Sequence, residues 1–338
     1  MDRSGPPTSS LMPADSISVV SADARRDRYV LISPCRDEAM HARTTIESVL
    51  AQTVRPALWV IVDDGSTDES PKILAEYASR FPFIRIVTRP DRGDRLLGRG
   101  VIDTFNDGLK TVDLNAFEYV CKFDLDLDLP REYFQGLMHA MEGDERLGCC
   151  SGKPYFKNHA SGQLIPEPCG DEHAVGMCKF YRVACFVQMG GFVNELMWDG
   201  IDTHRSRILG WKAASFNYPT LRFEHLRPMG SSHKSIWTGR VRHGHGQYFM
   251  GTHPLYLLVS AMWRMDKRPI IIGSMAILWG YFKAMLTRVP RYGDENFRSF
   301  LRAYQIRCLT LGKERATAEV ESQRASSWKP PEVRKLKS

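Results

Sequence analysis

Residues 58–70 read LWVIVDDGSTDES, an apolar run that ends in two aspartates, a glycine and a group of small polar residues. An uninterrupted apolar run bounded by turn residues is typical of a strand buried on both faces of a sheet. Gly65 suits a tight turn after the strand. Ser66 followed by Glu69 predicts a capping box, with Pro71 in the first turn of a helix. The segment therefore predicts a strand, a turn and a helix.

The same unit recurs along the first half of the chain. The strand candidates cover residues 28–33, 58–64, 83–88, 118–124 and 147–152. Apolar stripes at helical spacing lie between them, at Ile46, Val49 and Leu50, at Ile73, Leu74, Tyr77 and Ala78, at Val101, Phe105, Leu109 and Val112, and at Phe134, Leu137, Met138 and Met141. Strands that alternate with helices predict an α/β fold with a doubly wound, mostly parallel, Rossmann-like sheet.

Asp63 and Asp64 stand at the carboxyl end of the strand predicted at 58–64. Open parallel sheets bind ligands at this end of their strands. A carboxylate there can accept hydrogen bonds from the ring N–H of a base or from ribose hydroxyls. The alternative is that both aspartates only organise the turn and cap the helix.

A second acidic group follows the strand predicted at 118–124, where residues 118–130 read EYVCKFDLDLDLP. Asp124, Asp126 and Asp128 occupy alternate positions, so on an extended chain their side chains point the same way and repel one another. A Mg²⁺ or Mn²⁺ ion would offset that repulsion, since such cations take one or two carboxylates together with substrate phosphates. The alternative, a solvated acidic turn, is disfavoured by the buried type of strand that leads into it.

The formal net charge is +7 and the isoelectric point is near 9.0, which favours acidic partners such as phosphates or an anionic membrane surface. The basic residues form no patch interleaved with aromatic residues, so we expect no nucleic-acid partner. The eight cysteines show no CxxC pair and no zinc-ligand spacing, which indicates reduced thiols in a cytosolic protein.

Composition divides the chain into four parts. Residues 1–27 are polar and aperiodic, which predicts a disordered lead-in and no signal peptide. Residues 28–250 hold the alternating elements and then loops rich in glycine, histidine, proline and tryptophan. Residues 251–312 are apolar and basic and compatible with helices. Residues 313–338 are basic and contain proline and serine, which predicts a disordered tail.

The two acidic motifs, in this order and about sixty residues apart, resemble those of the family 2 glycosyltransferases, which have the GT-A fold. ISPCRDEA at 32–39 is similar to the first strand and turn of that family. GRGVIDTFNDG at 98–108 is similar to the basic, asparagine-bearing helix before its metal motif. The resemblance covers residues 28–250.

The resemblance implies a donor site for a nucleotide-diphospho-sugar. Asp63 or Asp64 would contact the nucleotide base and ribose, and Pro34 and Glu38 would line that pocket. Arg99 would meet a phosphate or, alternatively, lie at the surface.

The resemblance also implies a metal site. Asp124 and Asp126 would form an Asp-x-Asp pair in which Asp126 binds the metal and Asp124 is closer to the ribose. His225 matches a histidine that the family often places beside the metal and the diphosphate. Asp128 would instead cap a helix.

An inverting transfer needs a general base that takes the proton of the acceptor hydroxyl. The family resemblance implies that it comes from an acidic pair on a helix that ends about eleven residues later at a glycine. Asp199 stands eleven residues before Gly210, although Trp198 occupies the place where the family often has glutamate. Asp202, about one helical turn further on, is the rival, and both residues could simply be acids that favour a helix start.

Two later segments complete the predicted acceptor side. MGGF at 189–192 resembles a glycine turn that lets the backbone approach the sugar. The basic, Gly/Ser-rich stretch 224–248 predicts a flexible loop that closes over a diphosphate. Its basic residues are His225, His233, Lys234, Arg240 and Arg242.

Two apolar runs follow, at 254–262 and 269–286, with basic residues on their flanks. They predict a hydrophobic hairpin or interfacial helices, held at the inner face of the cytoplasmic membrane by basic and aromatic residues. A membrane span by the second run and a buried pair of helices are the alternatives.

The resulting hypothesis is an inverting glycosyltransferase, peripheral or monotopic at the membrane, that uses Mg²⁺ or Mn²⁺ and a glycan or lipid-linked acceptor in bacterial surface-polysaccharide synthesis. A nucleotidyltransferase of similar fold would want a glycine-rich basic loop after the first strand, and SPCRDEAM at 33–40 has no glycine. A non-catalytic scaffold at the membrane surface is the third possibility, which the retained Asp-x-Asp disfavours.

Overall fold

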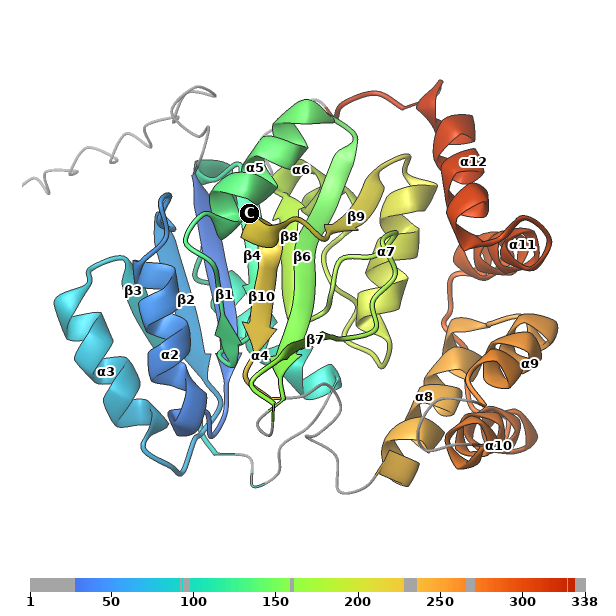
Figure 1. The fold of residues 1–338 in the computed structure, drawn as a ribbon, viewed down its shortest axis with the longest axis horizontal. Helices are drawn as coiled ribbons and strands as arrows, with labels where there is room; N and C mark the ends of the chain where they lie inside the picture. The colour runs from blue at the N-terminus through green and yellow to red at the C-terminus, as the bar shows by residue number, and fades with distance from the viewer. Residues whose placement is uncertain are drawn as a thin grey trace, which may run out of the picture.

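A twisted mixed sheet runs through the centre of the protein (Figure 1). The computed structural model describes residues 28–91, 93, 98–158, 161–227, 236–265, 271–326 and 328–331. The predicted lead-in 1–27, together with His233 and Lys234, lies outside these residues. Within them the strands are β1 (Tyr29–Cys35), β2 (Leu58–Asp63), β3 (Ile84–Thr88), β4 (Tyr119–Phe123), β5 (Leu127–Asp128), β6 (Leu147–Lys157), β7 (Leu164–Pro166), β8 (Cys178–Arg182), β9 (Lys212–Phe216) and β10 (Arg222–His225).

The strand order is β3-β2-β1-β4-β8-β6-β10-β5, with β7 and β9 paired to β6. Strands β1 to β4 are parallel, and β8 runs antiparallel to both β4 and β6. Because β1 pairs with β2 on one side and β4 on the other, the carboxyl ends of these three strands meet at one edge. This confirms the predicted α/β fold with a mostly parallel, doubly wound sheet.

Helices cover both faces of the sheet (Figure 1). Alternate residues of β1 point to opposite faces, so Tyr29 and Leu31 join one buried core while Val30 and Ile32 join the other. The first core is completed by α2 (Ala39–Leu50), α3 (Ser70–Arg80) and α5 (Tyr133–Gly143). The second is completed by α4 (Arg99–Leu109), α6 (Val183–Gln188) and α7 (Trp198–Ile208).

The start of α3 differs from the predicted capping box. The helix begins at Ser70, and the side chain of Glu69 makes no capping hydrogen bond. Asp68 Oδ1 instead accepts from the amide of Ser70 at 2.8 Å, while Ser66 Oγ accepts from the amide of Asp37 at 3.0 Å. The capping-box prediction is therefore wrong, because the polar side chains of this turn bind the turn after β1 as well as their own helix.

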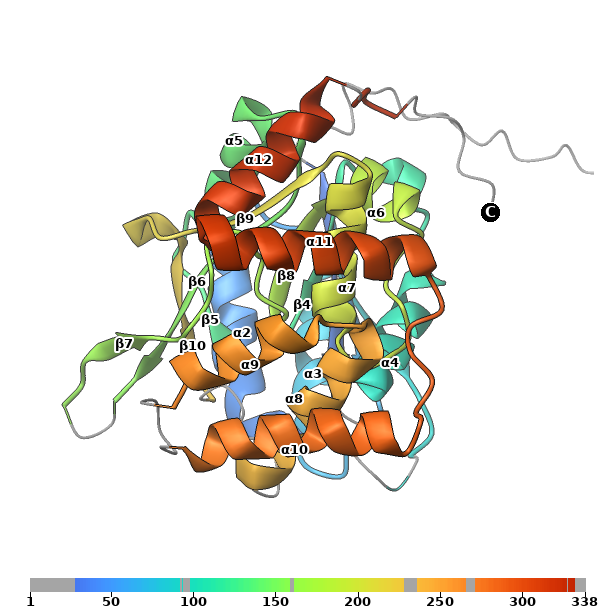
Figure 2. The same cartoon turned by 90° about the vertical axis from the view of Figure 1, so that its right-hand side faces the viewer.

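Five helices from the last third of the chain pack along the side of the sheet domain where α7 lies (Figure 2). They are α8 (Ile236–Met250), α9 (Pro254–Trp263), α10 (Ile272–Leu286), α11 (Glu295–Leu311) and α12 (Lys313–Ala325). The expectation of a flexible loop is wrong for residues 236–248, which belong to α8. The expectation of a disordered tail is wrong for Lys313–Ala325. There Ala316 and Val320 pack on Tyr304, and Tyr304 Oη and Thr317 Oγ1 share a 2.8 Å hydrogen bond.

Helices α8 and α10 touch through their backbones. A Cβ added at Gly244 would lie 1.9 Å from the carbonyl oxygen of Ile277, and one at Gly280 would lie 2.0 Å from that of Val241. Only glycine permits so close an approach. These two positions explain why a segment with little apolar content still forms a packed helix.

Helices α9 and α10 leave much of their apolar surface uncovered. Met262 and Trp263 are each 66% exposed, Ile272 is 58% exposed and Trp279 is 55% exposed. No helix in the described part of the chain is both long enough and apolar enough to cross a membrane.

Candidate active site

Asp63 and Asp64 lie at the carboxyl end of β2 and are both buried. Asp63 Oδ1 accepts from the amide of Ser66 at 3.0 Å, so this carboxylate also organises the turn. Asp64 Oδ1 pairs with Arg89 Nη1 at 3.0 Å. Both acids therefore lie where a nucleotide would meet the sheet, and each already has a local partner.

The pocket wall predicted from Pro34 and Glu38 lies at and just after the end of β1, beside β2. Pro34 is half-buried in the strand and Glu38 is buried. A residue not anticipated from the sequence, Arg36, donates to the backbone oxygen of Asp64 at 2.6 Å from its buried guanidinium. Arg36 thereby joins the turns after β1 and β2.

The structure brings Asp126 and His225 together although they are about a hundred residues apart. Antiparallel pairing of β10 with β5 sets His225 opposite Leu127, and the amide of Leu226 donates to the backbone oxygen of Asp126 at 2.8 Å. His225 Nε2 lies 3.7 Å from Asp126 Oδ2, and His225 Nδ1 lies 2.7 Å from Glu167 Oε2. Burial lowers the pKa of His225, but the bonds to Asp126 and Glu167 outweigh it and raise the pKa to about 9.

One guanidinium connects the turn after β1 with the second acidic motif. Arg227 Nη2 is bonded to Glu38 Oε2, and Arg227 Nε lies 3.8 Å from Asp126 Oδ2. Glu38 follows β1 and Asp126 follows β4, so both carboxylates face the same space at the carboxyl edge of the sheet. Neither Arg227 nor Glu167 was singled out from the sequence, since no local pattern marks them.

Asp124 lies close enough to Asp126 and His225 for their charges to act on it, whereas Asp128 and Arg99 have different surroundings. Asp124 pairs with the buried Lys122 Nζ at 2.5 Å. Asp128 is half-buried and lies opposite Glu224 in the β5–β10 ladder, rather than in a helix cap. Arg99 is exposed at the first residue of α4 and forms no ion pair with a described residue.

Asp126 retains an unused ligand atom. Its Oδ1 is buried and has no hydrogen-bond partner among the described residues. The described residues hold no group of three or more acidic, histidine or cysteine side chains that could hold a metal ion, so Asp124, Asp126 and His225 do not form a complete site by themselves. A carboxylate and substrate phosphates nevertheless fit the oxygen-rich coordination of Mg²⁺ or Mn²⁺, and His225 could add a nitrogen ligand once it has lost its proton. The hydrogen bond of His225 to Glu167 resembles the outer-sphere contact of many metal-binding histidines.

The two candidate bases have opposite environments. Asp202 is fully buried, with both carboxylate oxygens 2.6 Å from Lys179 Nζ and a further bond from Tyr181 Oη. Asp199 is exposed in the first turn of α7. The residue before that helix, Met197, has φ 66°, a conformation that is uncommon for a side-chain-bearing residue. This geometry favours Asp199 as the acid that an incoming hydroxyl could reach.

Trp198, which stands where the resemblance suggests an acid, is buried. Its ring centroid lies 5.5 Å from Lys122 Nζ and 5.6 Å from Lys179 Nζ. The indole therefore covers the lysines that pair with Asp124 and Asp202, a structural role that no local sequence pattern indicates.

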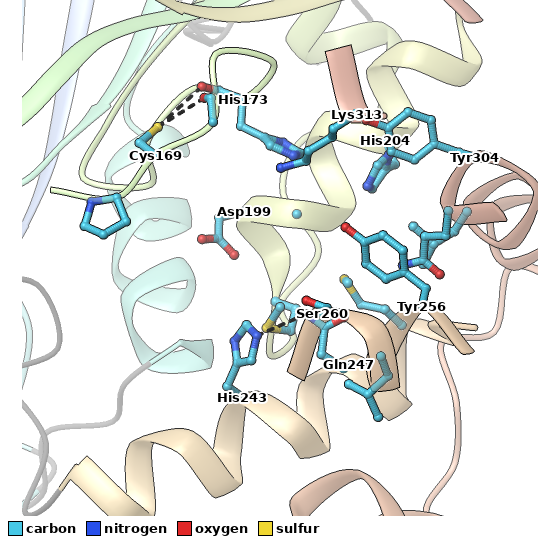
Figure 3. Close-up of a pocket in the computed structure, with 18 of the residues that line it drawn as sticks. Cys169, His173, Asp199, His204, His243, Gln247, Tyr256, Ser260, Tyr304 and Lys313 are labelled. Carbon is cyan, nitrogen blue, oxygen red and sulfur yellow. Dashed lines mark hydrogen bonds between the residues drawn. The ribbon is translucent and has the colours of Figure 1, made fainter. Parts of the chain in front are cut away.

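Asp199 lines a cavity of about 380 Å³ between the sheet domain and the C-terminal helices. Figure 3 shows Asp199 on α7 and His243 on α8 directed into it, with Tyr256 and Ser260 of α9 nearby. The loop that precedes β8 forms another wall, through Gly170, His173 and Gly176 among others. The cavity is large enough for a sugar-sized acceptor.

Part of the chain is similar to known glycosyltransferases. Residues 30–165 match the family model described as glycosyl transferase family 2. The chain is 24% identical over 127 residues to a poly-beta-1,6-N-acetyl-D-glucosamine synthase of Staphylococcus epidermidis, an alignment that covers 38% of this chain and 28% of that protein. The synthase of Staphylococcus aureus (strain COL) gives the same identity and coverage. The chain thus spans about a third or less of the length of the curated relatives that it matches.

Solved structures with similar folds are more distant in sequence. GalNAc-T7, solved with UDP, GalNAc and Mn²⁺, superposes with a TM-score of 0.54 at 14% identity, covering 83% of this chain and 57% of that one. The mannosyltransferase PcManGT from Pyrobaculum calidifontis, solved with GDP-Man and Mn²⁺, gives a TM-score of 0.47 at 17% identity over 88% of this chain and 86% of that one. Residues 30–165 are thus similar to the family 2 glycosyltransferases, and the chain has the GT-A fold.

Proposed function

We propose that the chain transfers a sugar, with inversion, from a nucleotide-diphospho-sugar to a hydroxyl of a glycan or lipid-linked acceptor at the cytoplasmic face of the membrane. The observation that carries this proposal is the bridge from Glu38 through Arg227 to Asp126. It means that the acids after β1 and β4 face one space, as a bound nucleotide and its diphosphate require. Residues 28–250 would form the catalytic domain and residues 251–312 the membrane-associated part.

On the donor side, Asp63 or Asp64 would accept hydrogen bonds from the base and ribose, next to Pro34 and Glu38. Asp126 would hold the divalent cation through its unpartnered Oδ1, with His225 and Asp124 beside it. When bound, Mg²⁺ or Mn²⁺ would offset the negative charge of the departing diphosphate. GalNAc-T7 was solved with UDP and Mn²⁺, which supports a divalent cation in this fold.

On the acceptor side, Asp199 would take the proton from the attacking hydroxyl. The acceptor oxygen then bonds to the anomeric carbon, and the bond from that carbon to the diphosphate breaks from the opposite face. Asp202 is unsuited to this role because Lys179 and Tyr181 occupy its oxygens. A surface-exposed carboxylate at the cavity wall can exchange its proton with water after each turnover.

The membrane assignment rests on the exposed apolar side chains of α9 and α10. Exposed patches of this kind mark interaction surfaces. Lys283 in α10, with Arg288 and Arg291 just after it, places positive charge beside that surface. A cytoplasmic leaflet offers both an apolar layer and negative charge.

The test is a donor-hydrolysis screen of nucleotide-sugars with Mn²⁺ or Mg²⁺, run on wild type, Asp126→Ala and Asp199→Asn. Asp128→Asn is the matched control, since it removes an acid two residues from Asp126 outside the contact network. We expect Asp126→Ala to lose metal-dependent donor binding and Asp199→Asn to keep it. Equal hydrolysis by all four proteins, or no metal-dependent binding by wild type, would overturn the proposal.

A further inference from the structure

The cavity that holds Asp199 adjoins a second one of about 480 Å³ at the end of α9. The two share lining residues from the loop before β8, from α10 and from the start of α12, together with Arg264. The second cavity adds Arg240 of α8 and Trp263 of α9. The pair forms one passage from the candidate base to the outer edge of the C-terminal helices.

Two arginines in this passage have no acidic partner. Arg264 Nη1 donates to the backbone oxygen of Ser260 at 3.0 Å, and no carboxylate pairs with Arg264 or Arg240 in the described part of the chain. Burial and the nearby Arg240 lower the pKa of Arg264, as expected for two neighbouring cations without a counter-charge. Lys313, which lines the same cavities, is by contrast paired with Glu172.

The surroundings of these arginines connect the candidate base to the apolar surface. Burial and the nearby Arg264 lower the pKa of His243 to about 4, so this ring is neutral at neutral pH, and Asp199 acts on it in the opposite direction. His243 and Asp199 line the first cavity together with Arg264, and Arg264 and Arg240 both line the second. Trp263 lines the second cavity and is also among the most exposed apolar residues of the protein. Along the passage, Asp199 lies in the first cavity, Arg264 lines both cavities, and Arg240 and the apolar Trp263 line the second.

This order matches the chemistry of an amphiphile in which a phosphate joins a sugar to a lipid chain. Guanidinium groups bind phosphate oxygens through paired, charge-assisted hydrogen bonds. Both arginines are half-buried, so a bound phosphate would supply a counter-charge that the described residues do not provide. A neutral glycan acceptor would leave both arginines unpaired.

We propose that Arg240 and Arg264 bind the phosphate of a lipid-phosphate-linked acceptor, whose sugar reaches Asp199 and whose lipid leaves past Trp263 along α10. The inference rests on the proposed function and names the acceptor class of that same site. In the transfer, the acceptor hydroxyl gives its proton to Asp199 and its oxygen bonds to the anomeric carbon, and the nucleoside diphosphate leaves with the electron pair of the broken bond.

The experiment uses the full chain and two linked measurements. The first is calorimetric binding of farnesyl monophosphate, with farnesol and inorganic phosphate as separate arms. We expect wild type to bind the lipid phosphate at least about tenfold more tightly than either arm, because only this probe offers both chemistries. Arg240→Gln and Arg264→Gln should each weaken that binding by about tenfold, with partial rescue by Arg264→Lys.

The control variant is Arg80→Gln, an exposed arginine on α3 that pairs with Glu76 one turn away and lies over the rings of Tyr77 and Phe81, far in sequence from the proposed site. Its binding and its thermal midpoint should equal those of wild type. Midpoints of the other variants must lie near that of wild type, and Arg264→Lys provides the comparison if Arg264→Gln folds poorly. Tight binding of farnesol, or unchanged binding by both glutamine variants, would overturn the inference.

The second measurement, donor hydrolysis, separates this inference from the proposed function. Arg240→Gln and Arg264→Gln should keep wild-type hydrolysis of the donor, since neither residue lies at the carboxyl edge of the sheet. Wild type that binds farnesyl monophosphate through the arginines but hydrolyses no donor would refute the proposed function alone. If donor hydrolysis is normal but Arg240→Gln and Arg264→Gln bind farnesyl monophosphate as tightly as wild type does, the acceptor site alone is refuted.

Discussion

The carboxyl edge of the sheet and the C-terminal helices differ in whether their cations are paired and whether their apolar side chains are covered. At the sheet edge, the half-buried Arg89 pairs with Asp64 and Asp107, and the buried Lys122 pairs with Asp124. In the C-terminal helices, Arg240 and Arg264 lack such partners in the described part of the chain, and large apolar side chains face outward. The first region is largely complete in itself, whereas the second has the composition of a surface that another molecule covers.

The largest effect that would sharpen this comparison is expected at Asp199. Asp199→Asn should lower transfer to acceptor by about 10²- to 10⁴-fold, because the amide cannot accept the proton. Stabilisation by UDP with Mn²⁺ should stay as in wild type, since a ligand of the folded state raises the unfolding midpoint. Steady-state transfer assays and thermal melts check the two halves of this prediction. A variant with wild-type transfer would remove Asp199 from the reaction.

Asp202 should behave as a structural residue. Asp202→Asn leaves the fully buried Lys179 without its counter-charge, which should lower the free energy of unfolding by about 3–5 kcal/mol. Urea denaturation measures this change, and the double variant Lys179→Met/Asp202→Asn should recover part of it. A stable Asp202→Asn protein with lost turnover would instead make Asp202 the base.

Acid should destabilise the junction between the two regions. Burial and the nearby Arg207 lower the pKa of His204 well below its ordinary value of 6.5, and His173 and Lys313 add to this while Glu172 opposes it. As the pH falls through about 6.5, the unfolded chain gains a proton that folded His204 does not. Stability should therefore fall by up to about 1.4 kcal/mol per pH unit for this residue. Denaturation at pH 7.5 and 5.5 tests this, and His204→Gln should show a smaller difference than wild type.

The smallest expected effect on stability concerns the exposed face of α10. Met275→Ser should change the free energy of unfolding by less than about 0.5 kcal/mol, because more than half of the Met275 side chain is exposed. Its binding to anionic phospholipid vesicles should nevertheless weaken. Ile277→Ser, two positions further on and buried, is the contrasting variant and should be clearly destabilised. Vesicle binding that Met275→Ser leaves unchanged would argue against this face as the contact surface.

The sheet was predictable from sequence because its strands are continuous apolar runs and their carboxyl ends carry recognisable acidic motifs. The contact between His225 and Asp126 is different, since it depends on β10 pairing with β5 in a particular register. The importance of Arg227 and Glu167 follows from that register too. No local pattern of residues encodes a pairing between segments about a hundred residues apart.

The C-terminal helices were harder to predict for a different reason. Helix α8 is rich in glycine and histidine and packs through backbone contact at Gly244, where no apolar stripe is needed. Helix α12 packs through small residues such as Ala316 and through the ion pair of Lys313 with Glu172. Hydrophobic periodicity predicts neither the backbone contact of α8 nor the small-residue and ion-pair contacts of α12.

The glycine contact between α8 and α10 has a geometric consequence. With no side chain between the two backbones, neither helix can slide or tilt without breaking contact at Gly244 and Gly280. The outward apolar side chains of α10 therefore keep a constant height above His243 and Arg240 of α8. If α10 rests on a bilayer, as we propose, the contact between α8 and α10 would fix the depth at which the sugar is transferred, and substitutions of surface side chains would leave that depth unchanged.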